Sequence, residues 1–353
     1  MINDNLIRQY KQRRWKRAGF LLALFVTLLL VSYYAFTTGG SDLSFRDFVA
    51  IFRSDHPEMA RQIFLNIRLP RLLAAIITGV ALSISGVIMQ VILRNPLASP
   101  YTLGISSSAA FGAALAIILF GSGSSVGKSG TVFYFDNPYV IALFSFACSL
   151  IGLFFILYIA RLRKSNSEII ILAGIIISSL FGAGISALQY IADKVQLSTI
   201  VFWSFGDLGR ANWTRLLIVS VVCIPLIIYF YLNRWNYKAL RSGDEYAYSL
   251  GVNPVRLRRL ALIGCTLCTS IVVSFFGVIA FVGLVVPHIV RACIGNNEDQ
   301  LIPVTALCGG VFLLLCDTLG RTLFSPIVIP VGIITSFVGV PIFLFLLLRK
   351  NLR

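Results

Sequence analysis

Residues 260–290 read LALIGCTLCTSIVVSFFGVIAFVGLVVPHIV, a stretch of 31 positions without one charged side chain. A helix that spans a bilayer needs about 20 mostly apolar residues, so this stretch is longer than one crossing requires but shorter than two full ones. Gly277 and Gly283 lie in its middle, and Pro287 follows them. The two glycines favour a break, with Pro287 in the second piece, and two helical crossings would make one of them short or only partly spanning.

The rest of the chain has the same apolar character. Of its 353 residues, 58% are hydrophobic and 12% are charged, whereas soluble domains carry roughly 25% charged residues. A surface as apolar as this is stable in lipid, provided that the backbone N–H and C=O groups of each helix are hydrogen-bonded within that helix. The sequence therefore predicts an all-α membrane protein. The other uncharged runs are 18–41, 72–93, 95–127, 137–160, 169–192, 216–233, 301–316 and 322–348.

The basic residues predict how these helices are oriented, because lysine and arginine collect on the cytoplasmic side of a membrane. They cluster at 8–17, 161–164, 234–259 and 349–353. If the last two clusters are both cytoplasmic, an even number of crossings separates them, and 260–290 must cross twice. We therefore expect ten transmembrane helices with both termini in the cytoplasm. The predicted divisions are a cytoplasmic tail at 1–17, a transmembrane domain at 18–350 and, within it, a cytoplasmic loop at 233–259.

A weak internal repeat supports a transporter. Arg68-Leu-Pro-Arg-Leu-Leu, followed later by Gly86-Val-Ile, resembles Arg256-Leu-Arg-Arg-Leu-Ala, followed by Gly277-Val-Ile. The first of these helices is expected to run from outside to inside and the second from inside to outside. Such inverted repeats are typical of membrane transporters.

The chemistry of an enzyme or a nucleic-acid-binding protein is missing from the sequence. The formal net charge is +16, but the basic residues lie at the ends of apolar runs rather than along a stripe with exposed aromatic residues. No paired carboxylates, catalytic triad or group of metal ligands is present, and His56 and His288 are far apart. We expect no catalytic residue, no metal, no cofactor and no nucleic-acid partner.

Acidic residues are also missing at mid-depth in the predicted helices, where an ion-coupled carrier usually needs one. Asp317 and Arg321 lie near the predicted outer mouth, one helical turn apart, and are expected to pair. The energy source is therefore expected in another chain, a separate ATPase. The alternative is an ion-coupled secondary transporter, which would transport without a partner.

Several motifs, taken together, resemble one known family. The chain is similar to the FecCD-type permeases, the membrane subunits of ABC importers for iron chelates, haem and vitamin B12. The resemblance covers nearly the whole chain from about residue 20. It rests on Arg68-Leu-Pro-Arg71, Ser85-Gly-Val-Ile-Met-Gln90, Arg94-Asn-Pro-Leu-Ala-Ser-Pro100, Leu103-Gly-Ile-Ser, Leu172-Ala-Gly-Ile, Gly243-Asp-Glu-Tyr-Ala247 with Leu250-Gly-Val, Gly277 to Arg291, and Ile329-Pro-Val-Gly-Ile-Ile-Thr with Gly339-Val-Pro-Ile-Phe.

The resemblance implies a vitamin B12-permease-like type II ABC importer fold in a bacterial inner membrane. It implies a homodimer of ten-helix subunits, surrounded by membrane lipid, with the substrate path between the two copies. Two ATP-binding subunits would dock from the cytoplasm and an extracytoplasmic substrate-binding protein from outside. A ferric siderophore is the substrate we expect first, with a corrinoid, haem or molybdate as the other candidates.

The resemblance also assigns roles to residues of this chain. The loop 233–259 would couple to the ATPase through a short helix, which Gly243 and two acidic residues would begin and Gly251 would end. The ATPase-coupling residues would be Gly243, Asp244, Glu245, Ala247, Leu250 and Gly251. Arg68, Arg71 and Arg321 would dock the binding protein. Asn95 and Leu97 would form a cytoplasmic gate, and a second gate would fall at 165–167.

Overall fold

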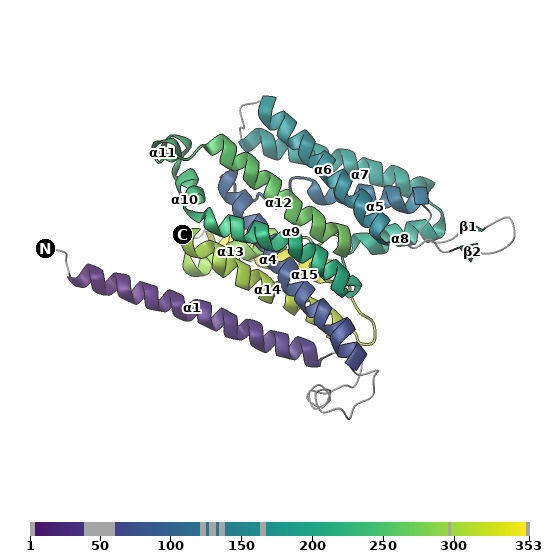
Figure 1. Ribbon diagram of the computed structural model, residues 1–353, viewed down its shortest axis with the longest axis horizontal. Helices are drawn as coiled ribbons and strands as arrows, with labels where there is room; N and C mark the ends of the chain where they lie inside the picture. The colour runs from purple at the N-terminus through teal and green to yellow at the C-terminus, as the bar shows by residue number, and fades with distance from the viewer. Residues whose placement is uncertain are drawn as a thin grey trace.

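The computed structural model describes residues 4–38, 61–120, 125–126, 132–133, 138–162, 167–295 and 298–350. Helices make up nearly all of this part of the chain (Figure 1). The elements are α1 (Asp4–Thr37), η1 (Ile63–Arg68), α4 (Leu69–Ile92), α5 (Ile105–Phe120), β1 (Ser125–Val126), β2 (Val132–Phe133), α6 (Pro138–Leu162), α7 (Ser167–Ile191), α8 (Lys194–Ser204), η2 (Leu208–Arg210), α9 (Trp213–Leu232), α10 (Arg234–Ser242), α11 (Asp244–Ser249), α12 (Pro254–Phe276), α13 (Val282–Ile294), α14 (Glu298–Thr322) and α15 (Val331–Lys350).

Within the described residues, seven helices are long and apolar enough to cross a membrane. They lie in α1, η1–α4, α6, α7, α9, α12 and α14. Three shorter helices are also apolar, at Ile105–Phe120, Val282–Ile294 and Val331–Leu346. The prediction of an all-α membrane protein is therefore confirmed.

The apolar stretch at 260–290 is divided between two helices, as predicted. α12 ends at Phe276, and Gly277 follows it with a φ of 75°, which is readily adopted only by glycine. A Cβ there would lie 2.4 Å from the carbonyl oxygen of Trp203, so the neighbouring chain also excludes a larger residue. α13 has only 13 residues and is the expected short segment. Gly283, however, lies inside α13 and not in the break, because its backbone packs against another helix.

That other helix is α4, which lies at the centre of the bundle and packs against α9, α12, α13 and α14. Two pairs of glycines allow the close approach. A Cβ on Gly86 would lie 1.8 Å from the carbonyl oxygen of Gly283, and one on Gly79 would lie 2.2 Å from that of Gly309. Small residues at helix crossings are how membrane helices bring their backbones together.

A neighbouring pair of glycines in α14 allows a matched test of this packing. A Cβ on Gly309 would lie 2.1 Å from the Ser83 hydroxyl oxygen, whereas the nearest atom to a Cβ on Gly310 would be 3.5 Å away. Gly309→Ala should therefore destabilise the protein by about 1–3 kcal/mol, the usual cost of overpacking. Gly310→Ala should be close to neutral. Thermal unfolding of the two variants in detergent checks this, and equal unfolding midpoints would contradict the packing.

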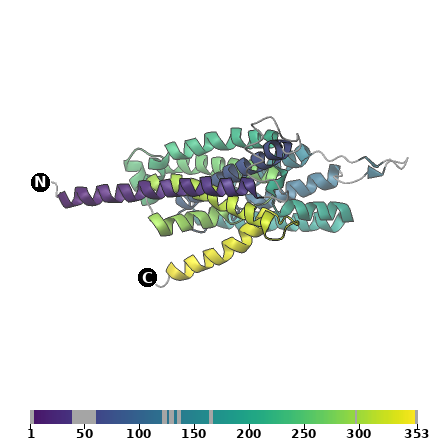
Figure 2. The same cartoon turned by 90° about the horizontal axis from the view of Figure 1, so that it is seen from below.

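α4 and α12 are antiparallel neighbours. Arg258, near the start of α12, donates from Nε to the carbonyl oxygen of Ile92 at the end of α4, at 3.0 Å. This is the relative direction that an inverted repeat requires, although the repeat itself stays a prediction. The N-terminal end of α1, the C-terminal end of α15 and α11 lie at the same end of the bundle (Figures 1 and 2). α1 continues as one helix across the boundary predicted at 17/18.

Candidate functional site

The loop predicted at 233–259 contains two short helices at one end of the bundle. Gly243, with φ of 137°, separates α10 from α11. α11 begins at Asp244, and Gly251, with φ of 78°, follows its last turn. The predicted short helix is therefore confirmed. Its two acidic residues lie in its first turn, where the helix dipole favours negative charge.

Asp244 is held by two arginines from the membrane helices, and we call these three residues the Asp244 cluster. Arg258 of α12 donates to both carboxylate oxygens, each at 2.7 Å. Arg94, which follows α4, donates to the same carboxylate and also to the carbonyl oxygen of Leu240, at 3.0 Å. The hydrogen bonds from Arg258 lower the pKa of the Asp244 carboxyl below its ordinary value. Asp244 therefore stays charged at neutral pH and ties α11 to the ends of α4 and α12.

The other predicted coupling residues divide between two faces of α11. Ala247 is fully buried against the chain, so it fixes the position of the helix. Glu245 is exposed, and the Leu250 side chain is 57% exposed. Two residues that the sequence did not single out, Tyr246 and Tyr248, are also half exposed. α11 therefore presents an outward face of aromatic, apolar and acidic side chains.

The turn predicted to form a gate lies directly after Arg94. Arg94 itself has a φ of 47°, an unusual value for a residue with a side chain. The Asn95 carboxamide oxygen accepts a hydrogen bond from the Leu97 amide at 2.8 Å, which fixes the turn, and Leu97 is 49% exposed. The Asp244 cluster is thus one residue away from the proposed gate. Of the second gate at 165–167, only Ser167, the first residue of α7, belongs to the described residues.

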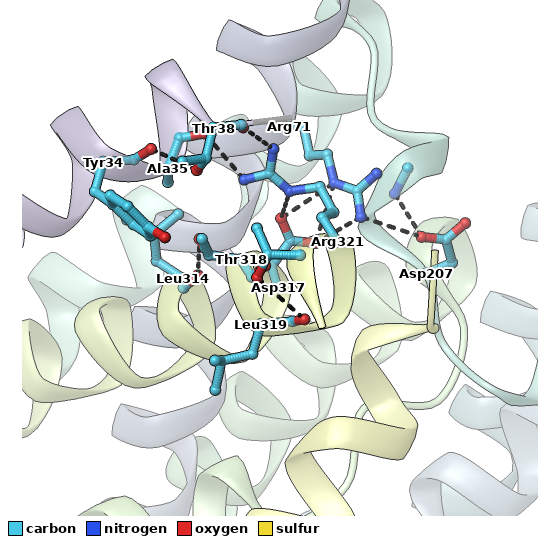
Figure 3. Close-up of polar contacts among 12 residues, drawn as sticks. Tyr34, Ala35, Thr38, Arg71, Asp207, Leu314, Asp317, Thr318, Leu319 and Arg321 are labelled. Carbon is cyan, nitrogen blue, oxygen red and sulfur yellow. Dashed lines mark hydrogen bonds and ion pairs between the residues drawn. The ribbon is translucent and has the colours of Figure 1, made fainter. Parts of the chain in front are cut away.

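A second cluster lies at the opposite end of α4, about 30 Å along its axis. It consists of Asp317, Arg71 and Arg321, and we call it the Asp317 cluster (Figure 3). The Asp317 carboxylate, only 1% exposed, accepts hydrogen bonds from Arg71 Nε at 3.1 Å and from a terminal guanidinium nitrogen of Arg71 at 2.8 Å. Arg321 donates from Nε to the same carboxylate at 3.1 Å. The predicted pairing of Asp317 with Arg321 is confirmed, and the larger part that Arg71 plays was not predicted.

The Asp317 cluster also fixes the end of α1. The two terminal nitrogens of Arg321 donate to the carbonyl oxygens of Thr38 and Ala35, each at 3.0 Å. Arg71 makes a longer ion pair, 3.8 Å, with Asp207. Figure 3 shows both guanidinium groups turned towards Asp317. Asp317 therefore links α4 to α14, and Arg321 links both helices to the end of α1.

Arg68, the third arginine predicted to dock a binding protein, lies beside this cluster rather than in it. It donates to the carbonyl oxygen of Phe36 at 2.9 Å, and its guanidinium lies 4.8 Å from the centre of the Phe64 ring. All three arginines are at most 13% exposed. Their role in docking stays a prediction. What the structure adds is that contacts within the chain already orient their side chains.

Ligands for a metal are not gathered anywhere in the described part of the chain, where no three His, Cys, Asp or Glu residues come together. His288 lies within α13 and its Nδ1 is 2.8 Å from the carbonyl oxygen of Leu284, so this ring nitrogen is engaged with the backbone. The features that point to a function are therefore the membrane helices, the exposed α11 and the two arginine–aspartate clusters.

Known proteins are similar to this chain in sequence and in fold. The sequence profile of the FecCD transport family matches residues 24–349. The chain belongs to this family. A permease protein of an ABC transporter from Methanocaldococcus jannaschii is 49% identical over 98% of this chain and 99% of its own length. The hemin transport system permease protein HmuU of Yersinia pestis is 41% identical over 94% of this chain and 95% of its own length.

A solved structure gives the same result for the fold. An inward-facing conformation of a metal-chelate type ABC transporter matches with a TM-score of 0.81 and 30% identity, over 94% of this chain and 99% of that one. FecCD permeases are membrane components that work with ATPase subunits and a binding protein. This FecCD chain is therefore a multi-pass membrane subunit of an ABC importer and not itself an enzyme.

Proposed function

We propose that this FecCD permease forms half of the membrane pathway of a metal-chelate importer that a separate ATPase drives. The observation that carries the proposal is the family match over residues 24–349. The seven long helices and the three shorter apolar ones would together make the ten crossings. Both termini would be cytoplasmic, because the ends of α1 and α15 lie on the side of α11 (Figure 1).

α11 would receive the movement of the ATPase, and the Asp244 cluster would pass it on. Its outward face carries Glu245, Tyr246 and Leu250, which suits a groove on a partner protein. Its inward contact is the Asp244 carboxylate, bound to Arg94, which follows α4, and to Arg258 of α12. A displacement of α11 would pull on both helix ends and on the gate turn that contains Asn95 and Leu97. Gly243 and Gly251 would flank the moving helix, and the buried Ala247 would pack it against the rest of the chain.

The binding protein would dock at the other end, on Arg68, Arg71 and Arg321. Guanidinium groups bind carboxylates in a planar, two-pronged geometry, and a docked partner could offer such carboxylates. Asp317 would keep two of these side chains aligned before docking. The hydrogen bonds of the three arginines within the chain support this proposal, because a pre-oriented side chain loses less conformational entropy on binding.

A second copy of the chain would complete the pathway. The helices α7 and α15 expose large apolar side chains along much of their length, including Ile176, Leu180, Phe337 and Phe345. In a homodimer, part of these faces would meet the other subunit and the remainder would meet lipid or line the path. Apolar walls suit the passage of a bulky chelate, because a chelate forms few strong contacts with them and can therefore leave easily.

The substrate class we propose is a metal chelate. A ferric siderophore stays our first prediction. Haemin is the second candidate, because the hemin permease HmuU is 41% identical to this chain, whereas a permease for iron chelatin from Helicobacter pylori is 35% identical and one for molybdate from Haemophilus influenzae is 34% identical. Isolating the binding protein with its bound ligand would identify the chelate directly.

The experiment that tests this function is reconstitution in liposomes. We expect uptake of the chelate only when the permease carries its ATPase subunits, when ATP is present on their side and when the loaded binding protein is on the other. An ion gradient across liposomes that hold the permease alone should drive no uptake. Uptake under that gradient without ATPase would support the alternative, an ion-coupled secondary transporter, and would refute the proposal.

A further inference from the structure

A cavity of about 440 Å³ lies near the end of the bundle that carries the Asp244 cluster, and neither the gate residues Asn95 and Leu97 nor the three docking arginines line it. Its walls come from the last turns of α6, the first turn of α7 and the start of α12. Three arginines line it, Arg161, Arg258 and Arg259, and among the described residues no carboxylate does so. The remaining walls are apolar and aromatic, and include Phe154, Tyr158 and Leu262.

The positive charge of this cavity is only partly balanced within the chain. Arg258 is 6% exposed and is bound by Asp244, which does not line the cavity. Arg161 and Arg259 are exposed and make no ion pair with any carboxylate of the described residues. Two guanidinium groups therefore remain available to an anion at the cavity.

The cavity spans the depth at which lipid headgroups meet acyl chains. The uncharged run 137–160 ends immediately before Arg161, and the run 260–290 begins immediately after Arg259. One to two helical turns deeper, Phe154 and Tyr158 of α6 stack with ring centres 6.3 Å apart. Their side chains are 64% and 53% exposed, so they face the surroundings of the bundle. The site thus has a cationic part at the level of the helix ends and an apolar wall on the membrane side.

We propose that this cavity binds the phosphate-containing headgroup of an anionic phospholipid. Arg161 and Arg259 would bind the phosphate, since guanidinium groups match phosphate oxygens in pairs. An acyl chain would lie along Phe154 and Tyr158. Basic pockets between membrane helices are a recognised form of lipid site. A free phosphate ion would use the arginines but leave the exposed aromatic wall uncovered, so we favour the lipid.

This site would place a lipid next to the machinery of coupling, because Arg258 belongs both to the cavity and to the Asp244 cluster. A phosphate there would attract the Arg258 guanidinium as Asp244 does. The composition of the membrane would then affect how firmly α11 is held. The assignment of this lipid to the cytoplasmic leaflet rests on the orientation given in the proposed function. The binding of a lipid at the cavity does not depend on that orientation.

The test measures lipid binding to the purified full-length permease by native mass spectrometry. Phosphatidylglycerol should bind more tightly than phosphatidylcholine. Arg161→Gln and Arg259→Gln should each weaken phosphatidylglycerol binding about fivefold, the usual effect of one basic residue at a lipid surface. The matched control is Arg234→Gln, which removes an arginine that stacks on Tyr231 and does not line the cavity. It should leave the binding unchanged.

Three results would overturn the proposal. One is equal binding of the two lipids, and another is an equal loss for the control and the cavity variants. The third is displacement of the lipid by millimolar inorganic phosphate, which would make this a site for a soluble anion. Because the readout is lipid binding, a chain that failed to import any chelate would still give a clear answer here.

Discussion

Replacing Asp317 by asparagine is expected to destabilise the folded permease by about 3 kcal/mol. Removing one partner of a buried ion pair costs about 3–5 kcal/mol, because the remaining charge is left without compensation. Here two guanidinium groups, on Arg71 and Arg321, would lose the one carboxylate that binds both. We take the lower end of the range because the asparagine carbonyl oxygen can still accept one hydrogen bond. The measurement is thermal or denaturant unfolding in detergent.

The control for Asp317→Asn is Glu245→Gln, which makes the same change of charge at an exposed position. The free energy of unfolding of that variant should equal that of the wild type to within about 0.5 kcal/mol, as is usual for surface substitutions. A second measurement separates stability from docking. Binding-protein affinity, measured below the unfolding temperature, should fall for Asp317→Asn and not for Glu245→Gln. Equal stability of the two variants would show that the Asp317 cluster does not hold α1, α4 and α14 together.

The two ends of α4 could be predicted from the sequence to different degrees. Asp317 and Arg321 are four residues apart, and a helix brings such residues to one face, so their pairing followed from spacing alone. Arg71 and Asp317 are separated by 246 residues. Only the packing of α4 against α14 brings them together, and this depends on the close approach of Gly79 and Gly309, which look like ordinary apolar sequence. The same holds for Arg94 and Arg258, whose common partner Asp244 lies in a different helix.

The break in 260–290 was predictable because it follows from two constraints: the length of the run and the parity of the crossings. Its position at Gly277 agrees with the need for a positive φ. The assignment of Gly283 to the same break was wrong, since glycine also serves where two helices cross, and its role there depends on a neighbour that is distant in sequence. Nor could the sequence say which face of α11 points inward, because six residues show no clear periodicity.

Because Asp244 points inward and Glu245 points outward, replacing the two residues should have different effects. Asp244→Lys would place a third positive charge between Arg94 and Arg258, whereas Glu245→Lys would change only the outward face of α11. The milder Asp244→Asn is expected to lower the rate of chelate transport about tenfold while ATP hydrolysis continues. Hydrogen bonds to charged groups contribute about 1.5–3 kcal/mol, and we use the low end because Asp244 is 40% exposed and screened by solvent.

A double-mutant cycle decides whether Asp244 acts through Arg258. If the link between α11 and α12 is what matters, Asp244→Asn and Arg258→Gln remove the same interaction. The double variant should then transport about as slowly as either single variant, whereas independent effects would multiply. The control cycle pairs Glu245→Gln with Arg258→Gln and should be additive. ATP hydrolysis by the assembled complex, measured in parallel, must persist in each variant, because loss of hydrolysis would indicate a lost ATPase contact. Additive losses in the first cycle would refute the transmission of movement through the Asp244 cluster.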